Sequence, residues 1–159
     1  MCQNDAPDEK SRRRARILIV ENHSVIRQAL IELVNQQTDL MVCAEAESAS
    51  GIMDDLDNQH IDVAIIDLSL RSPAGVCLAE ALRVKWPDLP ILALSLDDHW
   101  ASCERAFRAG ATGYVAKHEI AATIVPAIRQ VLSGKAYVSE KTAARLARAG
   151  VSCGWPSRV

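Results

Sequence analysis

The chain has 159 residues, is 49% hydrophobic and carries a formal net charge of -2 at pH 7. This length suits one globular domain with its own core, and the near-neutral charge excludes a strongly basic nucleic-acid-binding protein. No apolar run approaches the roughly 20 residues that cross a bilayer, and the run after SRRRAR is too short for a signal peptide. We therefore expect a cytoplasmic protein without a membrane partner. The five cysteines include no CxxC pair, which indicates neither a disulfide framework nor a zinc site.

The chain opens with a polar, charge-rich segment, and we expect residues 1–15 to form a disordered arm. From Arg16 onward, short aliphatic runs alternate with longer amphipathic segments. The runs are too short for helices and almost continuously apolar, as is typical of parallel strands buried on both faces. Five strands are therefore predicted, at residues 17–20, 40–44, 63–67, 90–95 and 113–116.

Apolar residues at helical spacing predict helices between these strands, over residues 25–34, 76–82 and 120–131. Ser24 is a candidate cap for the first of them, and Pro126 should bend the last or cost it a hydrogen bond. The strict alternation of strands and helices predicts an α/β fold, in which a five-stranded, doubly wound parallel sheet carries helices on both faces.

Polar residues gather where the predicted strands end. Glu21 and Asn22 follow the first strand, Asp67 ends the third, Ser95 ends the fourth, and Lys117 comes just after the fifth. In doubly wound sheets, ligands bind beyond the carboxyl ends of the strands. A single polar residue at a strand end is as easily explained as a hydrogen-bonded end of the strand. Polar residues at four neighbouring strand ends together predict a reactive site. A carboxylate nucleophile, a hydroxyl, an ammonium and oxygen ligands for a cation indicate phosphoryl transfer to Asp67.

These residues also carry a family resemblance. The segments ILIVENHSVIRQAL, VAIIDLSL, ILALS and RAGATGYVAK resemble the signature blocks of a response-regulator receiver domain, the CheY-like phosphoacceptor of two-component signalling. The resemblance covers roughly residues 16–134. AFRAGATGYVAKHE and GKAYVSEKTAARLAR are most similar to receivers of the NarL/FixJ (LuxR-type) transcription regulators. It implies a flavodoxin-like sheet of strand order 2-1-3-4-5 and a signalling domain, not an enzyme.

The resemblance implies a role for each matching residue. Asp67 would accept a phosphoryl group from a histidine kinase, and Lys117 would neutralise the phosphate. Ser95 would be the switch hydroxyl, and Tyr114 the aromatic residue that turns inward when the phosphate draws Ser95 toward it.

The resemblance also implies a Mg²⁺ site, formed by Glu21, Asn22, Asp67 and the main-chain carbonyl of Ser69. The second residue of the family's acidic pair is here the neutral Asn22, which predicts weak Mg²⁺ binding and therefore less efficient phosphorylation. A second departure is Arg71, which stands where the family usually has proline and affects only the expected loop geometry.

The C-terminal part, residues 135–159, is predicted to hold a short helix capped by Ser139 and running through Leu146, followed by a linker. It is too short for the DNA-reading helix-turn-helix that the resemblance implies. We expect a piece of a longer regulator more than a stand-alone receiver, with DNA contact only through the missing domain. We expect homodimerisation through the fourth helix, fifth strand and fifth helix, a face on which Arg129 is the expected exposed probe.

Two other functions stay open. Asn22 favours a pseudo-receiver, an interaction module regulated by a protein or ligand without phosphate. An unrelated flavodoxin-like enzyme, such as a phosphatase using Asp67, lacks a second general acid or base at the strand ends. His23 is interpreted as a loop or helix-start residue in preference to a metal ligand. Asp97, Asp98 and His99 are interpreted as a solvated loop that caps the following helix.

Overall fold

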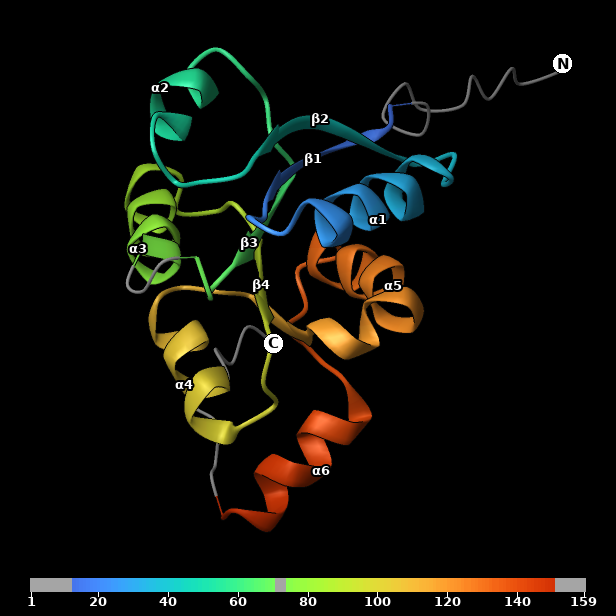
Figure 1. The fold of residues 1–159 in the computed structure, drawn as a ribbon, viewed down its shortest axis with the longest axis vertical. Helices are drawn as coiled ribbons and strands as arrows, with labels where there is room; N and C mark the ends of the chain where they lie inside the picture. The colour runs from blue at the N-terminus through green and yellow to red at the C-terminus, as the bar shows by residue number, and fades with distance from the viewer. Residues whose placement is uncertain (1–12, 71–73, 151–159) are drawn as a thin grey trace, which may run out of the picture.

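The computed structural model describes residues 13–70 and 74–150, and Figure 1 shows strands at the centre with helices on both sides. The sheet has the order β2-β1-β3-β4-β5-β6, and every neighbouring pair is parallel. Its strands are β1 (Ala15–Val20), β2 (Leu40–Ala46), β3 (Val63–Asp67), β4 (Ile91–Ser95), β5 (Gly113–Ala116) and β6 (Tyr137–Val138). Predictions about residues 1–12, 71–73 and 151–159, including the one about Arg71, lie outside the described residues.

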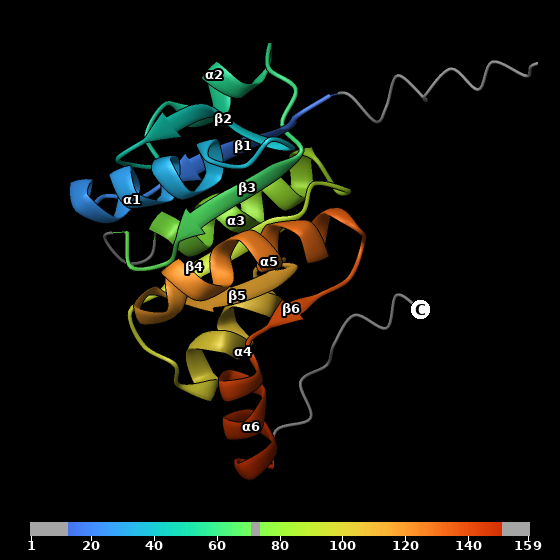
Figure 2. The ribbon, with the colours of Figure 1, turned by 90° about the vertical axis from the view of Figure 1, so that its right-hand side faces the viewer.

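The helices cover the two faces of the sheet, as the turned view in Figure 2 also shows. One face carries α1 (Ser24–Asn35) and α5 (Ile120–Leu132). The other carries α2 (Ile52–Leu56), α3 (Ala74–Lys85) and α4 (Trp100–Arg108). The 3-10 turn η2 (Lys117–Glu119) joins β5 to α5, and α6 (Glu140–Arg148) follows β6.

Two hydrophobic cores follow from this layering. In β1, Ile17 and Ile19 pack with α1 and α5, whereas Leu18 and Val20 pack toward α2 and α3. Successive side chains of a strand point to opposite faces, so a strand covered on both faces must be apolar at every position. Every residue of β3, β4 and β5 is accordingly buried. Because the two cores hold the strands rigidly, the polar residues at the strand ends are also fixed in position.

The predicted doubly wound sheet of order 2-1-3-4-5 is confirmed, and every strand end lies within two residues of the one expected. The predicted disordered arm was too long at its end, because Ala15 already belongs to β1. The sheet is one strand wider than predicted. Gly134 has a positive φ of 85°, which turns the chain after α5, and the Tyr137 amide then donates to the Thr112 carbonyl at 3.2 Å. A strand of two residues carries too little pattern to be recognised in the sequence.

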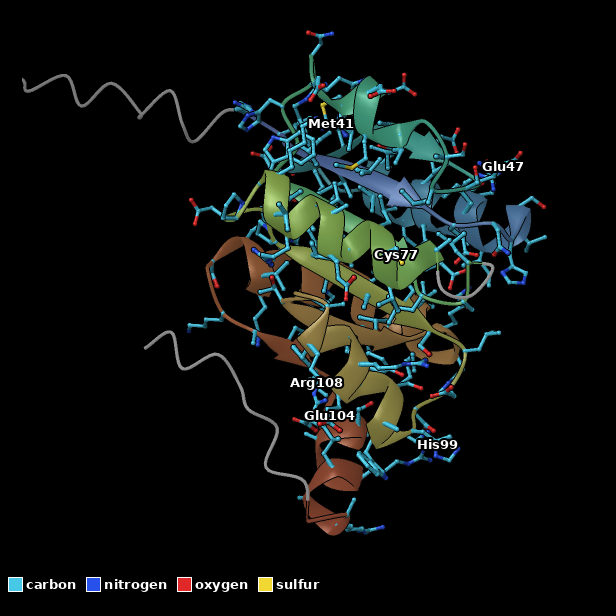
Figure 3. All side chains as sticks on the ribbon, turned by 90° about the vertical axis from the view of Figure 1, so that its left-hand side faces the viewer. Met41, Glu47, Cys77, His99, Glu104 and Arg108 are labelled. Carbon is cyan, nitrogen blue, oxygen red and sulfur yellow. The ribbon has the colours of Figure 1, made fainter. Side chains whose placement is uncertain are left out.

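Helix starts agree only in part with the predicted caps. Ser139 caps α6, and its hydroxyl accepts a hydrogen bond from the Thr142 amide at 3.2 Å, as predicted. The Ser24 prediction is wrong by one residue, because His23 is the N-cap of α1 and Ser24 is already helical. Of the predicted capping residues Asp97, Asp98 and His99, only His99 is the N-cap of α4, and Figure 3 labels it at the start of that helix; its side chain makes no capping hydrogen bond. Asp97 instead accepts from the His99 amide at 3.1 Å inside the loop.

Pro126 lies inside α5, which runs unbroken from Ile120 to Leu132. Since proline has no N–H, the Ala122 carbonyl loses its usual helical partner. Both Ala122 and Pro126 are exposed, so water can reach that carbonyl, and the buried side of the helix keeps its bonding. None of the helices in the described ranges is long and apolar enough to cross a membrane.

α6 packs against α4 at the lower end of the molecule in Figure 1. Thr142 and Leu146 are its buried residues, and Leu146 belongs to the same core as Tyr114 and Cys103. Arg145 forms an ion pair with Asp98, in the loop between β4 and α4. The predicted helix through Leu146 is thus present, and it is docked on the domain.

Candidate functional site

Four polar residues meet at the carboxyl ends of neighbouring strands, as the sequence predicts. Glu21 follows β1, Asp67 ends β3, Ser95 ends β4 and Lys117 follows β5. The ladder pairs Asp67 with Leu94, and Ser95 with Ala116, so the strand ends are level. All four residues are buried, Glu21 and Asp67 completely. Charged groups this deep require charged or hydrogen-bonding partners, because burial alone disfavours them.

Lys117 supplies that partner. Its Nζ atom lies 2.8 Å from Glu21 Oε2 and 2.8 Å from Asp67 Oδ2, and it donates a hydrogen bond to Glu21 Oε1 at 3.1 Å. Neither Oε2 nor Oδ2 has a hydrogen bond of suitable direction, so these two contacts are ion pairs. Two carboxylates and one ammonium leave the cluster with one net negative charge.

Asp67 is held by the turn that follows it. Its Oδ1 atom accepts a hydrogen bond from the Ser69 amide at 2.8 Å and another from the Ser69 hydroxyl. Burial by itself raises the pKa of the Asp67 carboxyl, but the Lys117 ammonium and the Ser69 hydrogen bonds outweigh it, and the pKa lies below its ordinary value. Asp67 is therefore an anion at neutral pH, with Oδ2 turned toward Lys117, which is the state that a nucleophile requires.

Gly75 explains how the Asp67 backbone is kept in place. A Cβ atom at this position would lie 2.4 Å from the Asp67 carbonyl oxygen and 2.9 Å from the Leu68 Cα atom. The first turn of α3 therefore packs directly on the end of β3, at a distance that only glycine allows.

Ser95 and Tyr114 form a separate group beside the carboxylates. The Ser95 hydroxyl accepts from the Asp97 amide at 3.4 Å, and the Tyr114 hydroxyl donates to the Asp97 carbonyl. The Tyr114 side chain is fully buried, and burial raises the pKa of its hydroxyl to about 12. The Tyr114 side chain therefore points inward in this structure, which is the orientation that the resemblance implied for the activated state. Leu146 of α6 lies in the same core and helps to enclose it.

The donor set fits a divalent cation. Oxygen atoms of Glu21 and Asp67 are buried and face one another across Lys117, and carboxylates are the usual ligands of hard cations. The resemblance also implied Asn22 and the main-chain carbonyl of Ser69 as ligands, and both residues are exposed. Ser69 bonds Asp67 through its amide and hydroxyl, and its carbonyl takes no part in these bonds. A cation bound here would neutralise negative charge at the Asp67 carboxylate.

Sequence reasoning missed the part that His23 plays in this cluster. His23 is the N-cap of α1, as a helix-start residue should be, but its Nδ1 atom also lies 2.9 Å from Glu21 Oε1. Glu21, His23 and Asp67 form the group of potential metal ligands among the described residues. Arg27 was also missed; its guanidinium donates to the Glu21 carbonyl at 2.8 Å and steadies the backbone there.

The predicted association face is partly covered by the chain itself. β6 pairs with the edge of β5, and α6 packs on α4. Arg129 was the wrong probe of that face, because its guanidinium pairs with Asp39, at 2.9 Å and 3.0 Å, between α1 and β2. The side of α5 that carries Arg129 therefore faces α1 and not α4.

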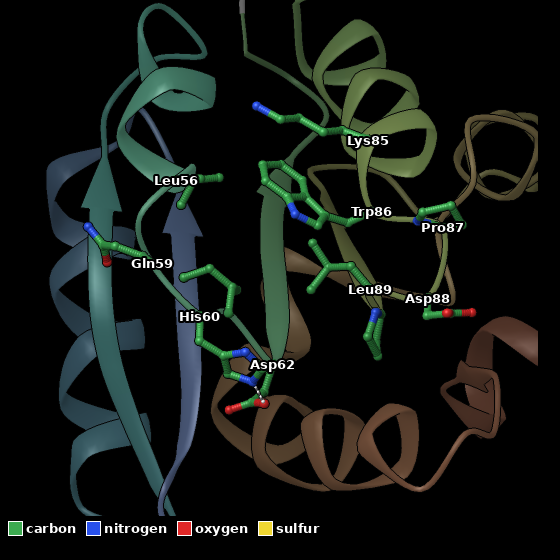
Figure 4. Close-up of a pocket in the computed structure, with 11 residues that line it drawn as sticks. Leu56, Gln59, His60, Asp62, Lys85, Trp86, Pro87, Asp88 and Leu89 are labelled. Atoms are coloured by element: carbon green, nitrogen blue, oxygen red, sulfur yellow. Dashed lines mark hydrogen bonds and ion pairs between the residues drawn. The ribbon is translucent and has the colours of Figure 1, made fainter.

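A hollow of about 430 Å³ opens at the opposite end of the sheet, before β3 and β4, as Figure 4 shows. Trp86, Leu56 and Leu89 line it, and His60 Nε2 lies 2.8 Å from Asp62 Oδ1 at its edge. Asp62 also accepts from the Arg16 amide at 2.7 Å, which is a structural role. The hollow lies far from the carboxylate cluster, so we assign the chemistry to the strand ends.

Comparison with known proteins agrees with this geometry. Residues 17–129 match the family model described as the response regulator receiver domain. The chain is 30% identical over 131 residues to the DNA-binding transcriptional activator DevR/DosR of Mycobacterium tuberculosis, covering 82% of this chain and 60% of that protein. It is 23% identical over 134 residues to the transcriptional regulatory protein DegU of Brevibacillus brevis, covering 84% and 57%. The chain thus spans less than two thirds of these relatives.

Solved structures show the same fold. A LuxR-family two-component response regulator from Aurantimonas sp. SI85-9A1 superposes with a TM-score of 0.81 at 29% identity, covering 87% of this chain and 99% of that one. The isolated REC domain of RcsB from Salmonella enterica serovar Typhimurium gives a TM-score of 0.76 at 21% identity, covering 84% and 98%. The second likeness concerns the fold alone.

Proposed function

Since this chain belongs to the response regulator receiver family, a part of two-component signalling, we propose that it accepts a phosphoryl group from a histidine kinase on Asp67 and thereby switches a transcriptional output. The observation that carries the proposal is the buried, ionised Asp67 carboxylate 2.8 Å from Lys117 Nζ. Family membership also argues against an unrelated flavodoxin-like enzyme.

In the proposed reaction, an Asp67 carboxylate oxygen attacks the phosphorus of a phosphohistidine. The new O–P bond forms as the P–N bond breaks, and the departing imidazole nitrogen keeps the electron pair and gains a proton from solvent. Lys117 transfers its contact from the carboxylate to the developing phosphoryl charge, and Ser69 holds Oδ1 in place. A divalent ion held by Glu21 and Asp67 would neutralise further negative charge.

The switch in this proposal runs through the loop after β4. Ser95 contacts the Asp97 amide, Tyr114 contacts the Asp97 carbonyl, and Asp98 pairs with Arg145. A phosphoryl group on Asp67 would draw the Ser95 hydroxyl toward it, and the loop would move with Ser95. The movement would reach α4 and α6, which form the surface where we propose that homodimerisation or contact with an output domain is regulated.

The remaining partners in this proposal follow from the relatives. One relative is by name a DNA-binding transcriptional activator, so the output would be a DNA-binding domain outside residues 13–150. A path from a histidine kinase to DNA would place the chain in the cytoplasm. A second candidate, a pseudo-receiver without phosphorylation, is favoured by the single observation that Asn22 replaces the second acidic residue and is exposed.

The test is mass spectrometry of the full chain after incubation with acetyl phosphate and magnesium. The native protein should gain one acid-labile phosphoryl group, and Asp67→Asn should gain none while keeping its circular dichroism spectrum. Asp88→Asn, which removes an exposed carboxylate, is the matched control and should behave as the native chain. A native chain that stays unmodified would favour the pseudo-receiver, and an adduct on Asp67→Asn would exclude Asp67 as the acceptor.

A further inference from the structure

His23 brings an imidazole nitrogen to the carboxylates of Glu21 and Asp67. Its Nδ1 atom lies 2.9 Å from Glu21 Oε1 and 4.0 Å from Asp67 Oδ2. We propose that His23 is an inner ligand of a divalent ion bound by Glu21 and Asp67, and that the ion is a borderline transition metal, such as Co²⁺ or Zn²⁺, in preference to Mg²⁺. His23 ligation rests on the proposed function and refines it, because it concerns the same carboxylate cluster.

The spacing of the three side chains suits one ion. Their ligand atoms all lie within 4.8 Å of one another. Atoms bound about 2.0 to 2.2 Å from a common ion lie at most about 4.4 Å apart, so small rotations of the side chains close the site. His23 is half exposed and therefore free to make such a rotation, while Glu21 and Asp67 are fixed by burial.

Two observations indicate that the cluster is built for a cation. Glu21 Oε2 and Asp67 Oδ2 are buried without a hydrogen bond of their own. The Lys117 ammonium lies 2.8 Å from each of them and 3.4 Å from His23 Nδ1, where a bound cation would have the same neighbours. An entering metal ion would repel the ammonium from these oxygens, and the flexible lysine side chain could shift within the cluster while Nζ stays in reach of a phosphoryl group on Asp67.

The chemistry of the donors determines which ion is preferred. Mg²⁺ prefers an octahedron of oxygen atoms, and it gains little from an imidazole. Borderline divalent ions gain from a nitrogen ligand, and two carboxylates with one imidazole form a mixed set of the kind that suits them. Asn22 removes a carboxylate that Mg²⁺ would use, whereas His23 supplies a donor that Mg²⁺ uses poorly. Both differences from an all-oxygen site therefore shift the selectivity away from Mg²⁺ and toward borderline divalent ions.

The His23→Ala variant separates ligation from folding. The His23 amide donates to Glu21 Oε1 at 2.9 Å, and the His23 carbonyl accepts from the Arg27 amide at 2.9 Å, so both main-chain contacts survive the loss of the imidazole. His99 offers a matched control. It is likewise an N-cap residue without a side-chain capping bond, and it lies outside the ligand group of the described residues.

The experiment titrates Co²⁺, Zn²⁺ and Mg²⁺ separately into the full chain without any phosphodonor, with calorimetry for affinity and visible absorption for Co²⁺ coordination. The native chain should bind Co²⁺ at least about ten-fold more tightly than Mg²⁺. His23→Ala should lose at least about ten-fold in Co²⁺ affinity, change the Co²⁺ spectrum and leave Mg²⁺ affinity nearly unchanged. His99→Ala should match the native chain. Asp67→Asn should weaken binding of all three ions, which assigns them to this cluster and not to a cysteine.

Three results would overturn the assignment: equal Co²⁺ affinities of the native chain and His23→Ala, equal losses for Co²⁺ and Mg²⁺, or no preference for Co²⁺ in the native chain. Equal losses would mean that His23 only positions Glu21. The proposed function fails separately. A chain that binds Co²⁺ through His23 but forms no Asp67 adduct would contradict phosphorylation alone, and a phosphorylated chain whose His23→Ala variant binds Co²⁺ unchanged would contradict ligation alone.

Discussion

Arg145 of α6 and Asp98 of the loop after β4 form an ion pair, which joins the last described helix to the segment that carries Ser95. The same Asp98 carboxylate lies 4.0 Å from Nε2 of His118, the residue after Lys117. The loop after β4 and the loop after β5 therefore meet at Asp98, and α6 is attached where they meet. A change at either strand end can reach α6 by a short path.

We predict that the apolar contact of α6 stabilises its docking more than the ion pair does. Leu146→Ala removes a buried side chain and should cost roughly 2 kcal/mol or more of docking free energy, whereas Arg145→Ala should cost about 1 kcal/mol or less because the pair is partly exposed. Hydrogen exchange of residues 140–148 measures both. Arg148→Ala, exposed on the same helix, is the control. Equal exchange in the Leu146 and Arg148 variants would contradict this packing.

Tyr114 should ionise only in strongly alkaline solution, because burial raises the pKa of its hydroxyl to about 12. The unfolded chain ionises near pH 10, so the stabilisation is fully present below that pH and is lost as the pH rises toward 12. The chain has two tyrosines, so subtracting the ultraviolet titration of Tyr114→Phe from that of the native chain isolates Tyr114. A midpoint near 10 in the difference would show that Tyr114 is not enclosed.

Gly75→Ala should destabilise the domain by roughly 1 to 3 kcal/mol or more, because the added Cβ would lie 2.4 Å from the Asp67 carbonyl oxygen. Gly51→Ala is an informative comparison. Gly51 has a positive φ of 77° but open space around it, so alanine there meets only backbone strain of about 1 to 2 kcal/mol. Urea denaturation gives both values. The Gly75 variant should also lower the rate of Asp67 phosphorylation, and the Gly51 variant should not.

Asn22→Asp should tighten Mg²⁺ binding by roughly ten-fold or more, since it restores a charged oxygen ligand to a hard-cation site. The change should also speed phosphorylation of Asp67. Calorimetric titration with Mg²⁺ measures the affinity, and Asn58→Asp adds the same charge at another exposed position as the control. If both variants bind Mg²⁺ alike, net charge and not the ligand at position 22 limits the affinity.

The alternation of apolar runs was enough to predict the sheet and its two covered faces, because strands buried on both sides have an unmistakable composition. It was also enough to bring Glu21, Asp67 and Lys117 together, since parallel strands end at one edge. β6 and α2 were missed because two and five residues carry no periodic signal.

The directions in which individual side chains point could not be predicted from the sequence. His23 was predicted correctly as a helix-start residue, but no pattern reveals that its imidazole turns back to Glu21. Likewise, an exposed Arg129 was predicted correctly, but the partner that determines its side of the helix, Asp39, lies 90 positions away in the chain. Contacts of this kind depend on packing between distant segments.

β6 has a consequence for solubility. Its two residues pair with Gly113 and Tyr114, and the Tyr137 amide also bonds the Thr112 carbonyl. Without β6, this edge of β5 would present unpaired N–H and C=O groups beside a fully apolar strand, which is a template for pairing with a second chain. The short strand therefore blocks edge-to-edge aggregation at β5. A variant that lacks β6 should show increased light scattering on gentle warming, at a temperature below that at which the domain unfolds.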